Sequence, residues 1–226
     1  MIQFIPIKKR TKQHIDTDNI IYIENTKELN SIAKKYNYAI EKYCLNSNEK
    51  CFCFRHEDIT FLTPMDVIDY KLNNMFSNPK IGVAGLIGTY LLETSCIWWN
   101  PGRAVNGAGS IVQVNAKGEE YEMRDWPGEH HGLATVDGCC LFLSKTFIDS
   151  GARFDEDLVE YHFYDVDICC QALEKQFDVS TIDIKAKHES EGHLPENFEQ
   201  LKLIFFSKWQ KKVERWPIGK YSKFKT

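Results

Sequence analysis

The sequence predicts an α/β domain with a mixed central sheet flanked by helices, and three observations favour this class. Short apolar runs that fit buried strands alternate along the chain with amphipathic segments that fit helices. A chain of 226 residues, 43% of them hydrophobic, can bury one core without disulfide or metal support. A hairpin pattern near the middle adds antiparallel strands. We therefore expect a single domain over residues 1–226.

The first helix is expected to follow two strands. Residues 2–7 and 20–24 are short apolar runs typical of strands. Asn25, with Glu28 three residues later, has the spacing of a helix N-cap and its capping box. The apolar residues after this box recur at the intervals of one helix face; they are Leu29, Ile32, Ala33, Tyr36, Ile40 and Tyr43. The sequence therefore predicts a helix that begins after Asn25.

Two further strands and a second helix are expected next. Residues 51–54 and 81–86 are apolar without alternation, which favours strands buried on both faces. Between them, Pro64 has the place of a first helical residue, and Asp66 falls in the first turn. This pattern predicts a helix that begins at Pro64.

A long inserted segment is expected from about residue 87 to 133. Glycines and tryptophans are frequent there, and residues 111–115 and 119–123 predict a hairpin that turns at 116–118. Loops of this length in a compact domain are usually functional or disordered, and the tryptophans argue against disorder.

The C-terminal part returns to alternating elements. Residues 139–143 predict a buried strand, 165–176 an amphipathic helix, 178–184 a late strand and 197–215 a final helix. The last stretch, 208–226, is basic with interleaved aromatic residues, and we expect a solvated tail.

Composition excludes several classes of protein. A net charge of −4 argues against a general nucleic-acid-binding protein, which needs a basic surplus. No apolar run is long enough to span a membrane, and the N-terminus lacks the pattern of a signal peptide. The eight cysteines form no Cys-x-x-Cys pair, so we expect reduced, buried thiols in a cytoplasmic protein.

Polar side chains that could perform chemistry follow the strand at 51–54. His56, Glu57 and Asp58 come directly after it, and ligands of α/β proteins bind at such carboxyl ends of strands. Carboxylates and an imidazole there could bind a divalent cation that bridges phosphate oxygens. The alternative is an ordinary solvated turn.

Two other polar groups are candidates. Asp165 and Asp167 open the helix at 165–176, where a carboxylate can serve as a general base or only complement the helix dipole. His188 and His193 are five residues apart with Gly192 between them, which does not fit the helical spacing of a zinc protease. A single histidine after a strand could still reach a metal.

The order of these segments resembles the glycosyltransferase-2-like proteins of the GT-A fold. The resemblance runs from about residue 20 to 209 and includes SIAKKYN, FRHEDITF, IGVAGLIGT, the Trp98-Trp99 pair, TVDGCCLFL and FDEDLVEYHFYDVDICCQALEKQF, followed by a histidine. It implies a GT-A-like domain in which the segment at 87–133 lies on the acceptor side.

The resemblance also implies roles for individual residues. Asp58 falls on the last aspartate of the family's Asp-x-Asp metal motif, in which His56 replaces the first, and His188 is similar to the histidine that reaches the metal or diphosphate. Asp165 falls on the proposed base, followed by Asp167, and Tyr164 replaces the family's glutamate. The positions implied for the donor are Ile7, Glu24, Asn25, Asn37, His56 and Glu57; those implied for the acceptor are Trp98, Trp99, Asp137, Gly138 and Tyr164.

These roles imply an enzyme that transfers a hexose or related sugar. The donor would be a UDP- or GDP-type nucleotide sugar, and the acceptor a hydroxyl of a glycan, a lipid-linked molecule or a protein. Transfer would proceed with inversion, assisted by Mn²⁺ or Mg²⁺, in glycan or polysaccharide synthesis. The alternatives are a nucleotide-sugar-binding module without catalysis and an interaction domain that uses the basic tail, with a peripheral membrane contact as a minority interpretation.

Overall fold

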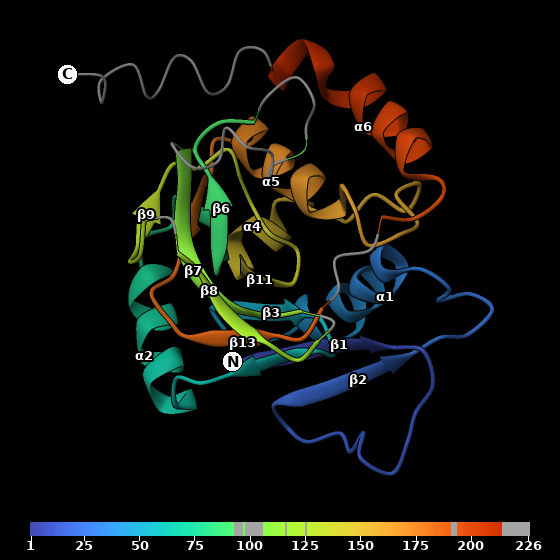
Figure 1. The fold of residues 1–226 in the computed structure, drawn as a ribbon, viewed down its shortest axis with the longest axis vertical. Coiled ribbons are helices and arrows are strands. Elements are labelled where there is room, and N and C mark those ends of the chain that lie inside the picture. The colour runs from blue at the N-terminus through green and yellow to red at the C-terminus, as the bar shows by residue number, and fades with distance from the viewer. Residues whose placement is uncertain (93–96, 98–105, 116, 125, 191–193, 214–226) are drawn as a thin grey trace.

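A seven-stranded mixed sheet forms the centre of the computed structural model, which describes residues 1–92, 97, 106–115, 117–124, 126–190 and 194–213 (Figure 1). The strand order is β2-β1-β3-β11-β5-β12-β9. The bounds are β1 Ile2–Ile7, β2 Ile20–Glu24, β3 Cys51–Arg55, β5 Ile81–Gly85, β9 His130–His131, β11 Cys140–Ser144 and β12 Asp178–Thr181. β1 pairs in parallel with both β2 and β3, so these three strands end at the same edge of the sheet.

A second sheet positions the last histidine of the proposed metal group. Its order is β10-β6-β7-β13-β4, with β8 paired to β7. The bounds are β4 Ile59–Phe61, β6 Ile87–Thr89, β7 Gly107–Val114, β8 Glu120–Arg124, β10 Thr135–Val136 and β13 Ala186–His188. Because β13 runs antiparallel to β4, His188 lies opposite Ile59 and next to the turn that carries Asp58.

Helices cover the sheets on several sides (Figure 1). They are α1 Ile32–Ala39, which continues into the π-turn Ile40–Cys44, then α2 Met65–Met75, α4 Lys145–Asp149, α5 Tyr164–Glu174 and α6 Phe198–Val213. α6 lies outside α5 at the upper right of Figure 1, and α2 lies at the lower left. The mixed α/β architecture predicted from the sequence is confirmed.

The start of α1 differs from the prediction. The helix begins at Ile32, and Ser31 is its N-cap because the Ser31 hydroxyl accepts a hydrogen bond from the Lys34 N–H. Asn25 instead follows directly after β2, which ends at Glu24, and its N–H donates to the Ile7 carbonyl. The second helix is shifted by one residue, with Pro64 as N-cap and Asp66 in the first turn.

The inserted segment is more regular than its composition predicts. β6 and the eight-residue β7 lie within 87–133, and β7 pairs with β8 as the predicted hairpin. Pairing with β13 and β6 on either side makes β7 part of the second sheet, a tertiary contact that local sequence does not reveal.

An aromatic cluster joins α1, the central sheet and α5. The Tyr36 ring lies 5.1 Å from Phe54 and 5.0 Å from Phe154, and Phe154 lies 6.1 Å from Tyr164, centroid to centroid. All four side chains are buried. Tilted aromatic pairs of this kind add roughly 0.5–1.5 kcal/mol each beyond area burial. The cluster therefore fixes Tyr164, at the start of α5, against the end of β3.

The cysteines behave as predicted wherever the structure describes them. Seven are free and buried: Cys44, Cys51, Cys53, Cys139, Cys140, Cys169 and Cys170. In apolar surroundings they act as small hydrophobic side chains. Across the described part of the chain, no helix combines the length and apolarity that crossing a membrane requires.

Candidate active site

His56, Asp58 and His188 form a cluster of metal-binding type. Each offers one ligand atom, and these atoms lie within 4.8 Å of one another. His56 and Asp58 come from the turn between β3 and β4, and His188 ends β13. The antiparallel β4–β13 pair brings the two segments together, because the Glu189 N–H donates to the Asp58 carbonyl at 3.0 Å. The three residues singled out in the sequence thus share one place in the fold.

Two atoms of this cluster favour a bound cation. Asp58 Oδ1 and His188 Nε2 are buried, 3.5 Å apart, and lack a hydrogen-bond partner among the described residues. Buried polar atoms in native proteins are nearly always paired, so these two atoms, which have only each other at ion-pair distance, are available to a ligand. The other nitrogen of His188 lies 3.2 Å from the Gln113 amide oxygen and can donate to it, which leaves the lone pair on Nε2. Two imidazoles and a carboxylate suit a first-row transition-metal ion better than Mg²⁺, which prefers oxygen ligands.

The charges around His188 point the same way. Burial lowers the pKa of His188, but the hydrogen-bonding capacity and charge of Asp58, together with Asp137, outweigh it, so the pKa is raised. Burial likewise raises the pKa of Asp58, while His188 and His56 more than offset this and lower it. The site therefore stabilises a positive charge between these side chains, whether a proton or a cation.

His56 is held as a neutral imidazole. Burial is the main cause that lowers its pKa to about 4, and the opposing effect of Asp58 is smaller. Its Nε2 lies 2.7 Å from the Tyr164 hydroxyl, which itself donates to the Gly138 carbonyl at 2.7 Å. A neutral imidazole retains one lone pair, so His56 can serve as a ligand at neutral pH.

Asp165 is the carboxylate most disturbed by its surroundings. It is buried at the start of α5, where its Oδ2 accepts a hydrogen bond of 2.9 Å from the Gly138 N–H. Burial, followed by the charge of Asp137, raises the pKa of Asp165 to about 7. A carboxylate tuned to this range is suited to accept a proton under physiological conditions.

The backbone before Asp165 is strained. Phe163, the N-cap of α5, has φ 65°, an unfavourable left-handed conformation for a bulky residue. The centroid of its ring lies 5.1 Å from that of Phe198 and 5.6 Å from that of Phe205, and both residues belong to α6. Such strain persists only where packing enforces it, and it concentrates at functional sites.

Asp137 connects the two halves of the site. Its charge raises the pKa of both Asp165 and His188, so it lies within electrostatic range of the proposed base and of the metal-type cluster. Its own Oδ1 accepts a 2.7 Å hydrogen bond from the Cys139 N–H. The loop 137–139 therefore lies between groups that are far apart in the sequence.

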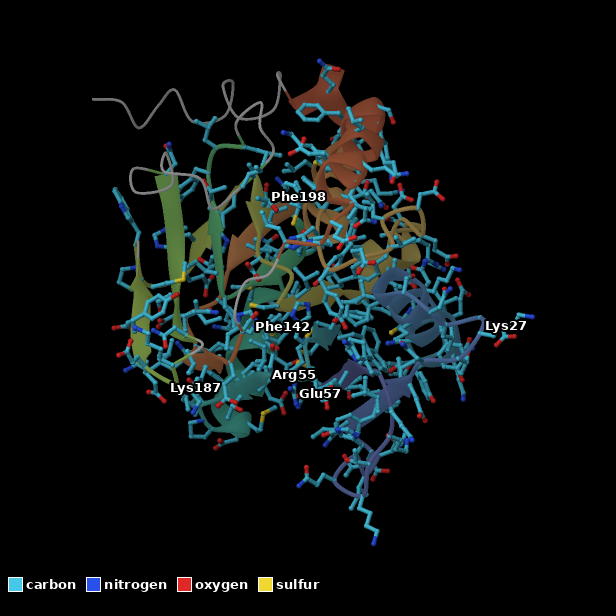
Figure 2. The ribbon with its side chains drawn as sticks, turned by 45° about the vertical axis from the view of Figure 1, so that its right-hand side comes forward. Lys27, Arg55, Glu57, Phe142, Lys187 and Phe198 are labelled. Atoms are coloured by element: carbon cyan, nitrogen blue, oxygen red, sulfur yellow. The ribbon has the colours of Figure 1, made fainter. Side chains whose placement is uncertain are left out.

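The predicted donor residues lie at the ends of β1, β2 and β3 but differ in availability. Ile7 is buried, and its carbonyl accepts hydrogen bonds from the Asn25 N–H and from Lys35 Nζ. Glu24 accepts a hydrogen bond from the Arg10 N–H, and Asn25 begins the next loop. Glu57 is half exposed and pairs with His14 at 2.7 Å; Figure 2 shows it near Arg55 at the end of β3.

Asn37 has a structural task in this fold. Its carboxamide accepts from the Phe154 N–H and donates to the Phe154 carbonyl and to Glu156, at 2.9 to 3.0 Å. These contacts tie α1 to the loop before α5. We therefore assign Asn37 to positioning that loop.

Asp167 also has its binding capacity occupied. It is fully buried and receives hydrogen bonds from Trp209 Nε1 at 2.6 Å and Gln171 Nε2 at 2.6 Å, with Lys208 Nζ at 2.7 Å. Trp209 and Lys208 belong to α6, so their contacts dock α6 on α5, and we assign Asp167 to that interface.

The residues predicted to bind the acceptor differ in their surroundings. Trp98 and Trp99 lie outside the described residues. Tyr164 is fully buried, so its contacts are His56 and Gly138 within the protein. A Cβ on Gly138 would collide with the Tyr164 hydroxyl and approach Asp165 Cβ to 2.8 Å, which explains the glycine.

Two side chains near the site escaped sequence reasoning. Lys35 is 3% exposed, and its Nζ donates to the Ile7 carbonyl at 3.0 Å. Its place three residues after Ile32, on the apolar face of α1, was the available signal. Tyr161 packs edge-on at 5.1 Å from His56 yet stays 45% exposed. Its loop position gave no signal.

Comparison with known proteins agrees with this geometry. A family model described as a glycosyltransferase-like family matches residues 12–196. The chain belongs to this family. None of the curated proteins matches the sequence.

Solved structures extend the likeness to the fold. The crystal structure of GalNAc-T7 with UDP, GalNAc and Mn²⁺ has a TM-score of 0.59 and 7% identity, covering 93% of this chain and 42% of that chain. A197 from STIV has a TM-score of 0.46 and 12% identity, covering 84% and 85%. CMP:2-keto-3-deoxy-manno-octonic acid synthetase complexed with CTP has a TM-score of 0.39 and 10% identity, covering 91% and 98%. The family model and the likeness to GalNAc-T7 confirm the GT-A-like fold expected from the sequence resemblance.

Proposed function

We propose that this glycosyltransferase-like protein transfers a hexose or related sugar from a UDP- or GDP-type nucleotide sugar to an acceptor hydroxyl, with inversion. The observation that carries the proposal is that hydrogen bonds through Tyr164 and the Gly138 peptide link two chemically different groups, the cluster with His56 and the carboxylate of Asp165. The His56–Asp58–His188 cluster can hold a cation, and Asp165 can take a proton. A sugar transferase of this type needs both functions at one site.

The donor side would be built from the cation-binding cluster and the ends of β1 and β2. When bound, Mn²⁺ or Mg²⁺ would neutralise negative charge on the diphosphate that leaves the sugar. Ile7 and Glu24 end β1 and β2, Asn25 follows β2 and Glu57 follows β3. In this proposal these residues would contact the nucleotide. GalNAc-T7, which shares the fold, was crystallised with UDP and Mn²⁺.

Asp165 would act on the acceptor side. Its carboxylate would accept the proton of the attacking hydroxyl, and a single displacement of this kind inverts the anomeric carbon. Burial at the start of α5 makes its charged form costly, so proton uptake is favourable during attack. Removal of such a base typically lowers the rate by about 10²–10⁴-fold.

The acceptor would be a glycan, a lipid-linked molecule or a protein. Trp98 and Trp99 remain candidates for a stacking surface, and the exposed Tyr161 ring beside His56 is another. We place the reaction in glycan synthesis in the cytoplasm, a setting that keeps the buried cysteines reduced.

A thermal-shift screen tests this proposal directly. UDP, GDP and CDP are added to the purified protein with and without Mn²⁺, and sugar transfer is then assayed from the nucleotide sugars of the stabilising bases. We expect one diphosphate to raise the melting temperature more with Mn²⁺ than without it. Absence of any stabilisation by all three diphosphates would contradict the donor class.

A nucleotide-sugar-binding module without catalysis is the second candidate. The residues His56 and Tyr164, which replace an aspartate and a glutamate of the family pattern, favour it. It predicts stabilisation by a diphosphate together with no transfer to water, glycans or peptides. Turnover by the wild-type protein, lost in Asp165→Asn, would exclude this candidate.

A further inference from the structure

The hydroxyl of Tyr164 determines where His56 carries its proton. The side chain is fully buried, and its hydroxyl has two described partners: the Gly138 carbonyl and His56 Nε2, each at 2.7 Å. A carbonyl oxygen can only accept, so the single hydroxyl proton points to Gly138. The hydroxyl oxygen must then accept a hydrogen bond from His56. This requires a proton on Nε2, and in a neutral imidazole it leaves the lone pair on Nδ1.

Tyr164 cannot easily move away from this position. Its ring packs at 6.2 Å from Tyr36 and 6.1 Å from Phe154. On the other side, Gly138 has no room for a Cβ beside the Tyr164 hydroxyl. The same glycine donates its N–H to Asp165 at 2.9 Å. One peptide group thus holds Tyr164 through its carbonyl and the proposed base through its N–H.

We propose that Tyr164 is a positioning residue that fixes His56 in the Nε2–H tautomer and so directs the Nδ1 lone pair of His56 to the cation of the site. The part of this proposal that concerns the cation rests on the proposed function; the tautomer does not. Hydrogen bonds from partners of metal-ligating histidines set both tautomer and ring orientation, and loss of such a partner typically weakens metal binding by about 10–100-fold.

The first test reads the tautomer in protein without added metal. ¹⁵N spectra of the imidazoles distinguish a protonated from an unprotonated ring nitrogen, and the His56 signals are assigned by their loss in His56→Gln. We expect wild-type His56 to be protonated at Nε2 and unprotonated at Nδ1 at neutral pH. A proton on Nδ1 in the wild type would overturn the proposal, and this measurement needs no variant of Tyr164.

The second test compares two matched substitutions. Tyr164→Phe removes the hydroxyl that His56 contacts. Tyr36→Phe removes a buried hydroxyl that has no hydrogen-bond partner among the described residues, from a ring in the same cluster. We expect Tyr164→Phe to shift the His56 tautomer toward Nδ1–H and to weaken Mn²⁺ binding about 10–100-fold, measured by the electron paramagnetic resonance signal of free Mn²⁺. Tyr36→Phe should change neither.

The outcomes separate this proposal from the proposed function. If wild-type protein binds no Mn²⁺, the metal-assisted function fails, while the tautomer shift in Tyr164→Phe still decides the role of Tyr164. If Tyr164→Phe keeps the wild-type tautomer and Mn²⁺ affinity, the positioning role is wrong, even where donor binding and transfer are confirmed.

Discussion

Asp165 and Asp167 lie two residues apart on α5, and both carboxylates are buried, yet they meet opposite environments. Residues two positions apart point about 200° apart around a helix, so the side chains face different neighbours. Asp165 faces the loop at Gly138, and Asp167 faces α6 through Lys208 and Trp209.

The partners of the two carboxylates indicate why we propose a functional role for Asp165 and a structural role for Asp167. Burial raises the pKa of both, but for Asp167 the effect is opposed by Lys208, Trp209 and Gln171. For Asp165 the charge of Asp137 adds to the effect of burial. A buried charge without a cationic partner is costly, and such costs persist where the group has a function.

The largest expected effect is on transfer. Asp165→Asn keeps an oxygen that can accept from the Gly138 N–H but cannot take up a proton as a base. We expect a rate loss of about 10²–10⁴-fold, with donor affinity unchanged. Asp167→Asn is the matched control, and its transfer rate should stay within a few-fold of wild type at a temperature where it is folded. Equal loss in both variants would remove the distinction between the two carboxylates.

The same two variants should change the free energy of unfolding in opposite directions. The pKa of Asp165 is raised from 3.8 to about 7 in the folded state, so the free energy of unfolding of the protein falls as the pH rises through that interval. Asp165→Asn avoids this cost, so its free energy of unfolding at pH 8 should exceed that of wild type by on the order of 4 kcal/mol at most. The pKa of Asp167 is raised as well, but Asp167→Asn also loses the buried ion pair with Lys208 and disrupts buried hydrogen bonds. We expect this loss to outweigh the relief of the raised pKa, so that the variant is less stable by about 1–3 kcal/mol. Urea unfolding at pH 8 measures both, and a stabilised Asp167→Asn would contradict the structural assignment.

Gly138→Ala sharpens the comparison from the side of the loop. The added methyl would push against the Tyr164 hydroxyl and Asp165 Cβ, so we expect a destabilisation of about 1–3 kcal/mol and reduced transfer. Gly118→Ala is the control, because among the described residues no atom beyond its chain neighbours lies within 4 Å of the new Cβ, although its φ of +78° costs some stability. Thermal melting and turnover of both variants test this; full activity in Gly138→Ala would show that the contact is unimportant.

The rate of transfer should also depend on pH. A base with a pKa of about 7 is active in its deprotonated form, so the rate should rise with pH through 7 and level off above 8. Below pH 6 it should fall about tenfold per pH unit. A profile that is flat from pH 5 to 8 would exclude Asp165 as the base.

Much of the fold was predictable because local patterns carry it. The unalternated apolar runs gave β3, β5 and β11, and the hairpin gave β7 and β8. Short strands such as β4 and β13 escaped prediction, because three residues carry too little pattern and their pairing is tertiary. The predicted capping box at Asn25 was wrong because Ser31 is the N-cap of this helix and accepts a hydrogen bond from the Lys34 N–H.

The site was predictable to the level of its segments. Sequence singled out Asp58, His188 and Asp165, and the fold places them around Asp137. The sequence could not distinguish Asp167 from Asp165. The side chains that bind the Asp167 carboxylate, Lys208 and Trp209, lie about forty residues after it in the chain. Nor could it reveal that Tyr164 is buried, because that depends on the packing of Tyr36 and Phe154.

We propose that the cation cluster binds the donor and that Asp165 accepts the proton at the same site. Titration calorimetry of the stabilising nucleoside diphosphate in Mn²⁺, with wild type, Asp58→Asn and Asp165→Asn, tests it most directly. We predict that Asp58→Asn binds at least about tenfold more weakly, whereas Asp165→Asn binds as wild type does. Wild-type affinity in Asp58→Asn would contradict the account.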